Sequence, residues 1–229
     1  MIRRSQYRCS FNILMDDIDV EEIVKKCKDK AQTFVEKKIL CNASFYRYEN
    51  MGFLYIEEIV ESNDSEAFDA DEFMADLKPY LKPWPEMDGD KFFAPMINVY
   101  FHHIPDLDIN EWEKERTTAV KERIGRVAFV YPDKLPSYVM HHNAIVEEGL
   151  LKGDKYAYIS LHENILFSYY EEPRNNVNIK GLEEESKVID NWLKVDPESH
   201  FDREKAQGKN FLVIPSLFTV DRVDFQGYR

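Results

Sequence analysis

The chain has 229 residues, of which 44% are hydrophobic, and it carries 43 acidic against 30 basic side chains, a formal net charge of −13. This charge argues against nucleic acid or an anionic membrane as a partner, because phosphate binding depends on clustered lysine and arginine. No apolar run reaches the roughly 20 residues of a membrane span, and the start does not read as a secretory signal. The three cysteines lack metal-ligand spacing. We therefore expect a cytoplasmic protein without a bound metal.

The first half of the chain is predicted to run in the order strand, helix, hairpin, helix and strand. The elements are a strand at 6–14, a helix at 20–40, a hairpin at 43–48 and 53–60, a short helix opening at 69–72, and a strand at 96–102. Asp69 or Asp71 would cap the short helix. A charged segment at 110–124 follows, for which the pattern predicts a solvated helical linker.

The second half repeats this order. Its predicted elements are a strand at 127–131, a helix from Pro136 to about 151, a hairpin at 156–161 and 165–171, a helix at 182–193, and a strand at 210–220.

A short internal repeat supports a duplication. Residues 49–58 read ENMGFLYIEE and residues 163–172 read ENILFSYYEE, so six of ten positions are identical at an offset of 114 residues. Each half then has the order βαββαβ of a ferredoxin-like unit. We predict an α+β fold made of a unit at 1–105, a linker at 106–124 and a unit at 125–229. The two sheets would pair within the chain as a pseudo-dimer of the dimeric α+β barrel type.

The helix of the second half carries a candidate acid–base group. At about 100° per residue, Tyr138, His142 and Ile145 share the side that faces the sheet, whereas His141 points away and Met140 points out. Histidine has the side chain whose unperturbed pKa lies closest to neutrality. The alternative is that His142 is a packed residue with one satisfied nitrogen.

Residues 126–221 resemble the L-rhamnose mutarotase family. The resemblance rests on four groups of residues in the family's order: Arg126–Val130; Tyr138, His142, Asn143 and Ile145; Ile159, Leu161, Asn164, Leu166 and Phe167; and Asn191–Lys194 with Leu217 and Phe218. It implies a cofactor-independent isomerase that interconverts the α and β anomers of L-rhamnose or a related deoxy sugar. It also implies that His142 is the proton donor and that Tyr138 and Trp192 bind the sugar.

The chain departs from the family's pattern in two places. Leu193 replaces the second of two adjacent tryptophans, and Ala157 stands where a sugar-contacting tyrosine is expected. Tyr156 and Tyr158 flank Ala157 and are the candidates for that contact.

In the first half, Val24 and Lys28 occupy the positions of Tyr138 and His142, so we expect a single site, in the second half. His102, His103 and Trp84 are weaker candidates.

Two alternatives to an isomerase remain. One is a non-catalytic sugar-binding or scaffold protein, and the other is a different enzyme of the same fold, of the monooxygenase or haem-degrading type. The expected partner is a small-molecule sugar, with no cofactor, and the chain would be a monomeric pseudo-dimer or a homodimer.

Overall fold

The computed structural model describes residues 1–12, 20–62, 64–86, 89–117 and 122–224. The chain divides into two compact units that are not continuous in sequence. The first unit comprises Met1–Met96, Pro105–Thr118 and Pro215–Arg229, and the second comprises Ile97–Ile104 and Ala119–Ile214.

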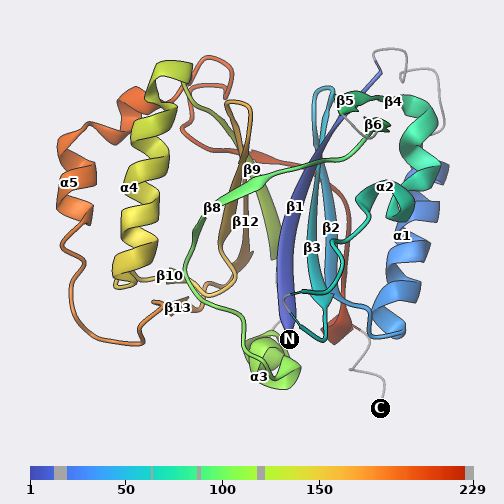
Figure 1. The fold of residues 1–229 in the computed structure, drawn as a ribbon, viewed down its shortest axis with the longest axis horizontal. Coiled ribbons are helices and arrows are strands. Elements are labelled where there is room, and N and C mark those ends of the chain that lie inside the picture. Colours follow the sequence, from blue (N-terminus) through green and yellow to red (C-terminus); the bar gives the residue numbers. More distant parts are fainter. Residues whose placement is uncertain (13–19, 63, 87–88, 118–121, 225–229) are drawn as a thin grey trace. The chain divides into compact units, whose positions relative to one another are not determined.

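The first unit has one sheet with α1 and α2 on one face (Figure 1). Its strands in the described residues follow the order β15-β2-β3-β1-β4, and β7 also pairs with β1. The elements are β1 (Ile2–Phe11), α1 (Val20–Glu36), β2 (Leu40–Tyr48), β3 (Met51–Ile59), α2 (Ala70–Phe73), the 3-10 helix η2 (Ala75–Tyr80), β4 (Leu81–Lys82), β7 (Ala94–Pro95) and β15 (Ser216–Asp221), with a small hairpin of β5 (Trp84–Glu86) and β6 (Gly89–Lys91).

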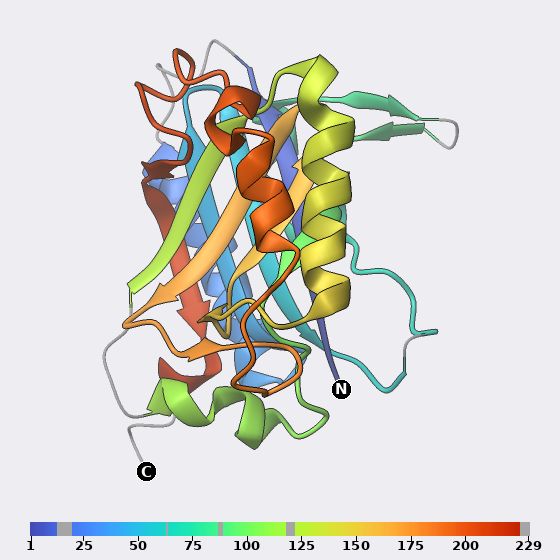
Figure 2. The same ribbon diagram turned by 90° about the vertical axis from the view of Figure 1, so that its left-hand side faces the viewer.

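The second unit has the same construction. Its sheet has the order β14-β9-β12-β11-β8, and Figure 2 shows α4 and α5 lying across one face of it. The elements are β8 (Ile97–Phe101), β9 (Glu122–Phe129), the 3-10 helix η4 (Pro132–Lys134), α4 (Leu135–Glu148), β11 (Tyr158–His162), β12 (Ile165–Glu172), α5 (Ile189–Lys194), the 3-10 helix η5 (Pro197–His200) and β14 (Leu212–Ile214), with a short pair of β10 (Gly153–Asp154) and β13 (Asn176–Val177).

The two halves of the sequence exchange their last strands. β7 completes the first unit, and after Met96 the chain continues as β8, which pairs with β11 of the second unit. In the same way, β14 completes the second unit, and after Pro215 the chain continues as β15, which pairs with β2. The expected strands at 96–102 and 210–220 therefore lie partly in the other unit, so the expected division at 105 and 125 does not follow the pairing.

The register of the strands confirms the duplication. Tyr55 donates a hydrogen bond from its hydroxyl to Glu57 Oε1 at 2.6 Å, and Tyr169, 114 residues further on, donates to Glu171 Oε1 at 2.7 Å. Glu49 and Glu163, at the two hairpin turns, both have positive φ, 52° and 56°.

The exchanged strands match as well. β15 skips one residue against β2 between Ser216 and Phe218, and β8 skips one against β11 between Asn98 and Tyr100. The predicted α+β fold with a duplicated ferredoxin-like unit is thus confirmed.

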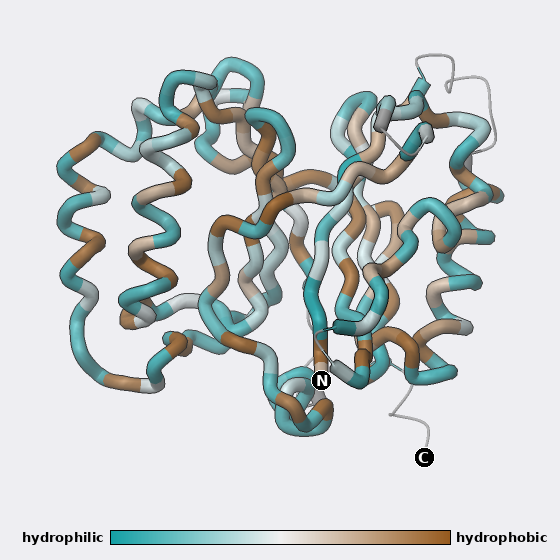
Figure 3. The backbone as a smooth tube through the Cα atoms, viewed as in Figure 1, coloured by the Kyte–Doolittle hydropathy of each residue, from teal (hydrophilic) through white to brown (hydrophobic). Residues whose placement is uncertain are grey.

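Several element boundaries agree with the sequence. Of the two predicted caps, Asp69 and Asp71, it is Asp69 that caps α2, by accepting a hydrogen bond from Glu72 N at 2.8 Å. Pro136 lies in the first turn of α4, which ends at Gly149 with φ of 68°. In Figure 3, α4 and α5 alternate between hydrophobic and hydrophilic residues, as expected of helices with one buried side.

The helix predicted at 182–193 is shorter than expected, because α5 begins only at Ile189. The carboxylate of Glu148, at the end of α4, accepts hydrogen bonds from the backbone N–H groups of Lys187 and Val188 at 2.7 and 3.3 Å and from the hydroxyl of Ser186. These contacts hold the preceding segment in an irregular conformation and supply the partners that the helix start needs.

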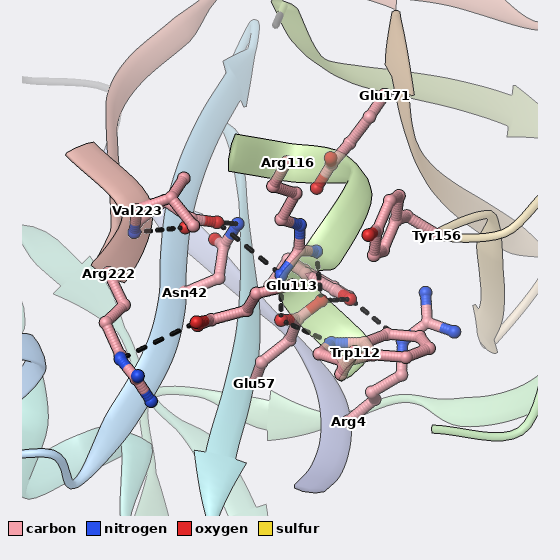
Figure 4. A network of polar contacts seen from close by, with 12 residues as sticks. Arg4, Asn42, Glu57, Trp112, Glu113, Arg116, Tyr156, Glu171, Arg222 and Val223 are labelled. Atoms are coloured by element: carbon pink, nitrogen blue, oxygen red, sulfur yellow. Dashed lines mark hydrogen bonds and ion pairs between the residues drawn. The ribbon is translucent and has the colours of Figure 1, made fainter. Parts of the chain in front are cut away.

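The expectation of a solvated linker was wrong for the part of it that the structure describes. The segment forms α3 (Ile109–Glu113) and the 3-10 helix η3 (Lys114–Thr117), and Trp112, Glu113 and Arg116 are buried. Arg116 donates two hydrogen bonds of 2.7 Å to the carboxylate of Glu57, and Trp112 Nε1 donates a third of 3.1 Å (Figure 4). The polar residues of this segment therefore pair with a buried carboxylate of the sheet. Residues 118–121 lie outside the described residues.

No helix in the described part of the chain is long and apolar enough to cross a membrane.

Candidate active site

Helix α4 places Tyr138 and His142 on the face that packs against the sheet of the second unit. Tyr138 is 1% exposed and belongs to a buried cluster with Ile145 and Tyr100, whereas Met140 is 71% exposed. The predicted positions of Tyr138 and Ile145 on the buried side and of Met140 on the exposed side are therefore confirmed. His141, predicted to point away, is partly buried like His142, and its ring lies 5.4 Å from that of Trp192. The alternative of a merely packed histidine depends on what surrounds the ring.

The ring of His142 has a defined tautomer. Its Nδ1 lies 2.8 Å from the backbone carbonyl oxygen of Tyr138. Because a carbonyl oxygen only accepts hydrogen bonds, Nδ1 must carry the proton, which leaves the Nε2 lone pair free to accept one. No hydrogen bond from the described residues reaches Nε2. His142 is therefore arranged as a base, whereas the family resemblance implied a proton donor.

Aromatic rings surround His142. Tyr138 stacks on it with ring centroids 3.8 Å apart, and the rings of Trp192 and Tyr100 approach edge-on at 5.0 and 5.5 Å. Burial lowers the pKa of His142 to about 4, and the charges of His141 and His200 act in the same direction, against the hydrogen bond to Tyr138. The imidazole is therefore neutral at physiological pH.

Tyr138 has the opposite protonation preference. Burial, followed by the proximity of Tyr100, raises the pKa of its hydroxyl, while the charge of Arg126 lowers it. The hydroxyl is buried and has no hydrogen-bond partner among the described residues. The neutral imidazole of His142 and the protonated phenol of Tyr138 thus lie next to each other, and the O–H group of Tyr138 is free to donate a hydrogen bond.

Trp192 is brought to this cluster, although not as an open platform. It is 8% exposed, and its ring lies 5.4 Å from that of His141 and 4.8 Å from that of His200, in addition to His142. Its neighbour Leu193, which replaces the family's second tryptophan, is 60% exposed.

Tyr156 and Tyr158 are not brought to the cluster. Tyr158 pairs across the sheet with Tyr169, whereas its neighbour Ile159 belongs to the core beneath the helices. Since successive side chains of a strand point to opposite faces, Tyr158 points away from the face that His142 covers. Tyr156 precedes β11 and is fully buried, with the ammonium of Lys155 5.8 Å from its ring.

The weaker candidates have structural surroundings. The hydroxyl of Tyr100 lies 3.0 Å from His102 Nε2, and a Cβ on Gly153 would come within 2.1 Å of the His102 ring, which therefore depends on a glycine there. The guanidinium of Arg8 lies 5.2 Å over the ring of Trp84. Nothing in the described residues connects His103 to His142.

Two site residues were missed at the level of sequence. Tyr100 reaches the site only through the strand exchange, for which the sequence gives no local signal. Arg126 lies on β9 in line with the buried Ala128 and Val130. Its charge at a position that alternates with core residues was a usable signal.

No protein-family model matches the chain, and no curated protein matches it in sequence. Among solved structures, it is similar to a "putative monooxygenase" from Fusobacterium nucleatum, at 12% identity and a TM-score of 0.42, over 96% of this chain and 94% of that one. A "putative monooxygenase" from Lactobacillus acidophilus has 7% identity and a TM-score of 0.42, over 96% of each chain. A "putative chlorite dismutase" has 12% identity and a TM-score of 0.42, over 100% of this chain and 99% of that one.

Proposed function

We propose that the second unit is a cofactor-independent isomerase that interconverts the α and β anomers of an aldose, L-rhamnose or a related sugar. The observation that carries this proposal is the pairing of a neutral imidazole, whose Nε2 accepts a proton, with a protonated and unpartnered phenol on the same helix face. Ring opening of a pyranose needs one group to take a proton and another to give one. His142 and Tyr138 have those two roles in their resting states.

In the proposed reaction, His142 Nε2 takes the proton of the anomeric hydroxyl as the bond between C1 and the ring oxygen breaks. The ring oxygen takes the proton of the Tyr138 hydroxyl, and C1 becomes an aldehyde carbon. After the aldehyde turns, the two protons return by the reverse path and close the ring as the other anomer. The charge of Arg126 stabilises the transient phenolate of Tyr138, in keeping with its effect on the pKa of Tyr138.

A second candidate function is cofactor-free oxygenation. The specific observation that favours it is that three aromatic rings, those of Tyr100, Tyr138 and Trp192, surround His142, and that the ring of Phe201 packs on Tyr138. Such walls suit a flat aromatic substrate, and a neutral histidine could deprotonate a phenol before it reacts with oxygen.

One experiment separates these functions. The protein is added to equilibrated L-rhamnose and, separately, to L-fucose, and anomer exchange is measured by saturation-transfer NMR. We expect exchange to accelerate in proportion to protein concentration, with no uptake of oxygen. Sugar contact without faster exchange would identify a binding protein. Oxygen consumption with a phenolic substrate, and no effect on sugars, would favour the oxygenase.

A further inference from the structure

The guanidinium of Arg126 is a partly buried cation with few protein partners in the second unit. It lies over the ring of Tyr170 at 4.4 Å and over the ring of Phe211 at 5.0 Å. One of its donors, Nη2, reaches the hydroxyl of Ser168 at 2.9 Å, whereas Nε is buried without a partner among the described residues. A guanidinium has five N–H donors, so protein groups use little of the hydrogen-bonding capacity of Arg126.

Arg126 also lacks a counter-charge. Among the described residues, no carboxylate lies within ion-pair distance of it, and burial lowers its pKa from the usual value for arginine. Desolvation penalises a charge that is withdrawn even partly from water, so such groups are normally paired. The carboxylate that acts on Arg126 is that of Glu172, which is itself paired with Arg174.

The corresponding residue in the first unit is Tyr7. Tyr7 pairs with Leu54, Arg126 pairs with Ser168, and Ser168 lies 114 residues after Leu54. The cation is therefore a feature of the unit that holds His142.

Arg126 and the free hydroxyl of Tyr138 border the same part of the core. The ring of Tyr138 lies 5.8 Å from that of Phe201, which lies 5.6 Å from that of Phe211, over which Arg126 is placed. The charge of Arg126 also acts on the hydroxyl of Tyr138, and the reverse holds. Two unsatisfied donors, one of them cationic, therefore lie within electrostatic range of each other on the helix-covered face of the sheet.

We propose that the substrate of this site is an anion, a hexuronate, whose carboxylate is bound by Arg126 while its ring oxygen faces Tyr138. In a pyranose form of a hexuronate, the carboxylate is attached to C5, which is bonded directly to the ring oxygen. A cation for the carboxylate and a donor for the ring oxygen must then lie on the same side of the sheet, where ring contacts through Phe211 and Phe201 link Arg126 to Tyr138. The opening and closing of the sugar ring rests on the proposed function, whereas the binding of the carboxylate by Arg126 does not.

The net charge of −13 makes a local cation more informative. An acidic surface repels anions, so attraction to a carboxylate must come from a local positive charge such as that of the partly buried Arg126. The neutral deoxy sugars of the L-rhamnose mutarotase family would make no use of this charge.

The test uses two sets of sugars that differ only at C6. One set is D-galacturonate, D-galactose and D-fucose, and the other is D-glucuronate, D-glucose and D-quinovose, which carry a carboxylate, a hydroxymethyl and a methyl group respectively. Binding is measured by isothermal titration calorimetry at pH 7 and constant ionic strength. We expect the wild-type protein to bind one uronate at least about 10-fold more tightly than the methyl sugar of its set.

Two arginine variants then test which cation binds the carboxylate of the uronate. Arg126→Gln should abolish that preference while leaving the affinity for the methyl sugar within about 3-fold. Arg174→Gln is the matched control, because Arg174 also lies over the ring of Tyr170, at 4.8 Å, but is half exposed and paired with Glu172. It should retain the preference. Circular dichroism checks that both variants fold, and Arg126→Met, which also removes the charge, replaces the glutamine variant if that one does not.

The proposal is overturned if neither uronate is preferred by the wild-type protein, a comparison that needs no variant. It is also overturned if both arginine variants lose the preference equally, because the effect would then be one of net charge. Anomer exchange of all three sugars in a set at equal rates would uphold the isomerase and refute the uronate. Uronate binding that depends on Arg126, without any exchange, would uphold the carboxylate site and refute the isomerase.

Discussion

The Nδ1 atom of His142 lies 2.8 Å from the carbonyl oxygen of Tyr138, one helical turn earlier, while the rings of the two residues stack at 3.8 Å. One contact fixes the tautomer of the base, and the other holds its ring beside the phenol. The neutral imidazole of His142 and the protonated hydroxyl of Tyr138 therefore coexist over a wide range of pH.

The first prediction concerns the pH dependence of the proposed reaction. Because the base is the neutral imidazole and burial lowers the pKa of His142 to about 4, the exchange rate should be flat from about pH 5 to 8 and fall as the pH drops through 4. Anomer exchange followed by NMR in a series of buffers checks this. A rate that rises with a midpoint near 6.5, the ordinary value for histidine, would show that His142 is not buried in this way.

The lowered pKa of His142 also affects the free energy of unfolding. The unfolded chain takes up a proton on His142 near pH 6.5 and the folded chain only near 4, so stability should fall as the pH falls through this window. His142→Asn should remove part of that slope, which urea titrations at pH 4.5 and 7 would measure.

Glu113 should have the opposite pH dependence. Burial, together with the charges of Asp221 and Glu57, raises the pKa of Glu113 to about 7 against the opposing effect of Arg222 and Arg116. The folded chain then holds a proton that the unfolded chain releases near 4.5, so stability is lost as the pH rises from 4.5 through 7.

We expect Glu113→Gln to stabilise the protein by about 1 to 3 kcal/mol at pH 8 and to change little at pH 4.5. Thermal melts at pH 8 and pH 4.5 would measure this difference in stability. Glu111→Gln, an exposed neighbour on α3, serves as the control and should be neutral at both. Equal effects of the two variants would contradict the assignment.

The ion pair between Arg116 and Glu57 should be costly to break from one side. Both side chains are fully buried, and although burial opposes ionisation of Glu57, the charge and hydrogen bonds of Arg116 lower its pKa to about 2. Arg116→Met should therefore destabilise the protein by about 3 to 5 kcal/mol at pH 7. Lys114→Met, on the same segment with an exposed partner, should cost less than about 1 kcal/mol. The double variant Glu57→Gln, Arg116→Met should recover part of the loss in a double-mutant cycle.

Gly52 has no room for a side chain. A Cβ there would lie 2.5 Å from Cys9 Sγ and 2.8 Å from the ring of Phe45, both of which are fully buried. We expect Gly52→Ala to destabilise the protein by about 1 to 3 kcal/mol in urea unfolding. Adding Phe45→Leu should return some of this loss. An alanine variant as stable as the wild type would mean that the core there adapts freely.

The sequence was informative wherever the physical cause is local. Helical spacing placed Tyr138 and His142 on one face, and the hairpin repeat predicted the duplication, because turn residues and side-chain period act over a few positions. It did not predict that α5 starts late, since Glu148 captures backbone groups 39 and 40 residues away. Nor did it predict the strand exchange that brings in Tyr100, because the pairing of β8 with β11 depends on contacts between distant parts of the chain.

The most direct test of the central claim compares two adjacent histidines. Wild-type protein, His142→Asn and His141→Asn are each assayed at pH 6 for anomer exchange, with D-galacturonate and L-rhamnose as substrates. The account predicts that exchange falls to the uncatalysed rate in His142→Asn and stays within about 3-fold of wild type in His141→Asn. The ring of His141 contacts Trp192, whereas that of His142 stacks on Tyr138. Full exchange in His142→Asn, or no acceleration by the wild-type protein with either sugar, would contradict it.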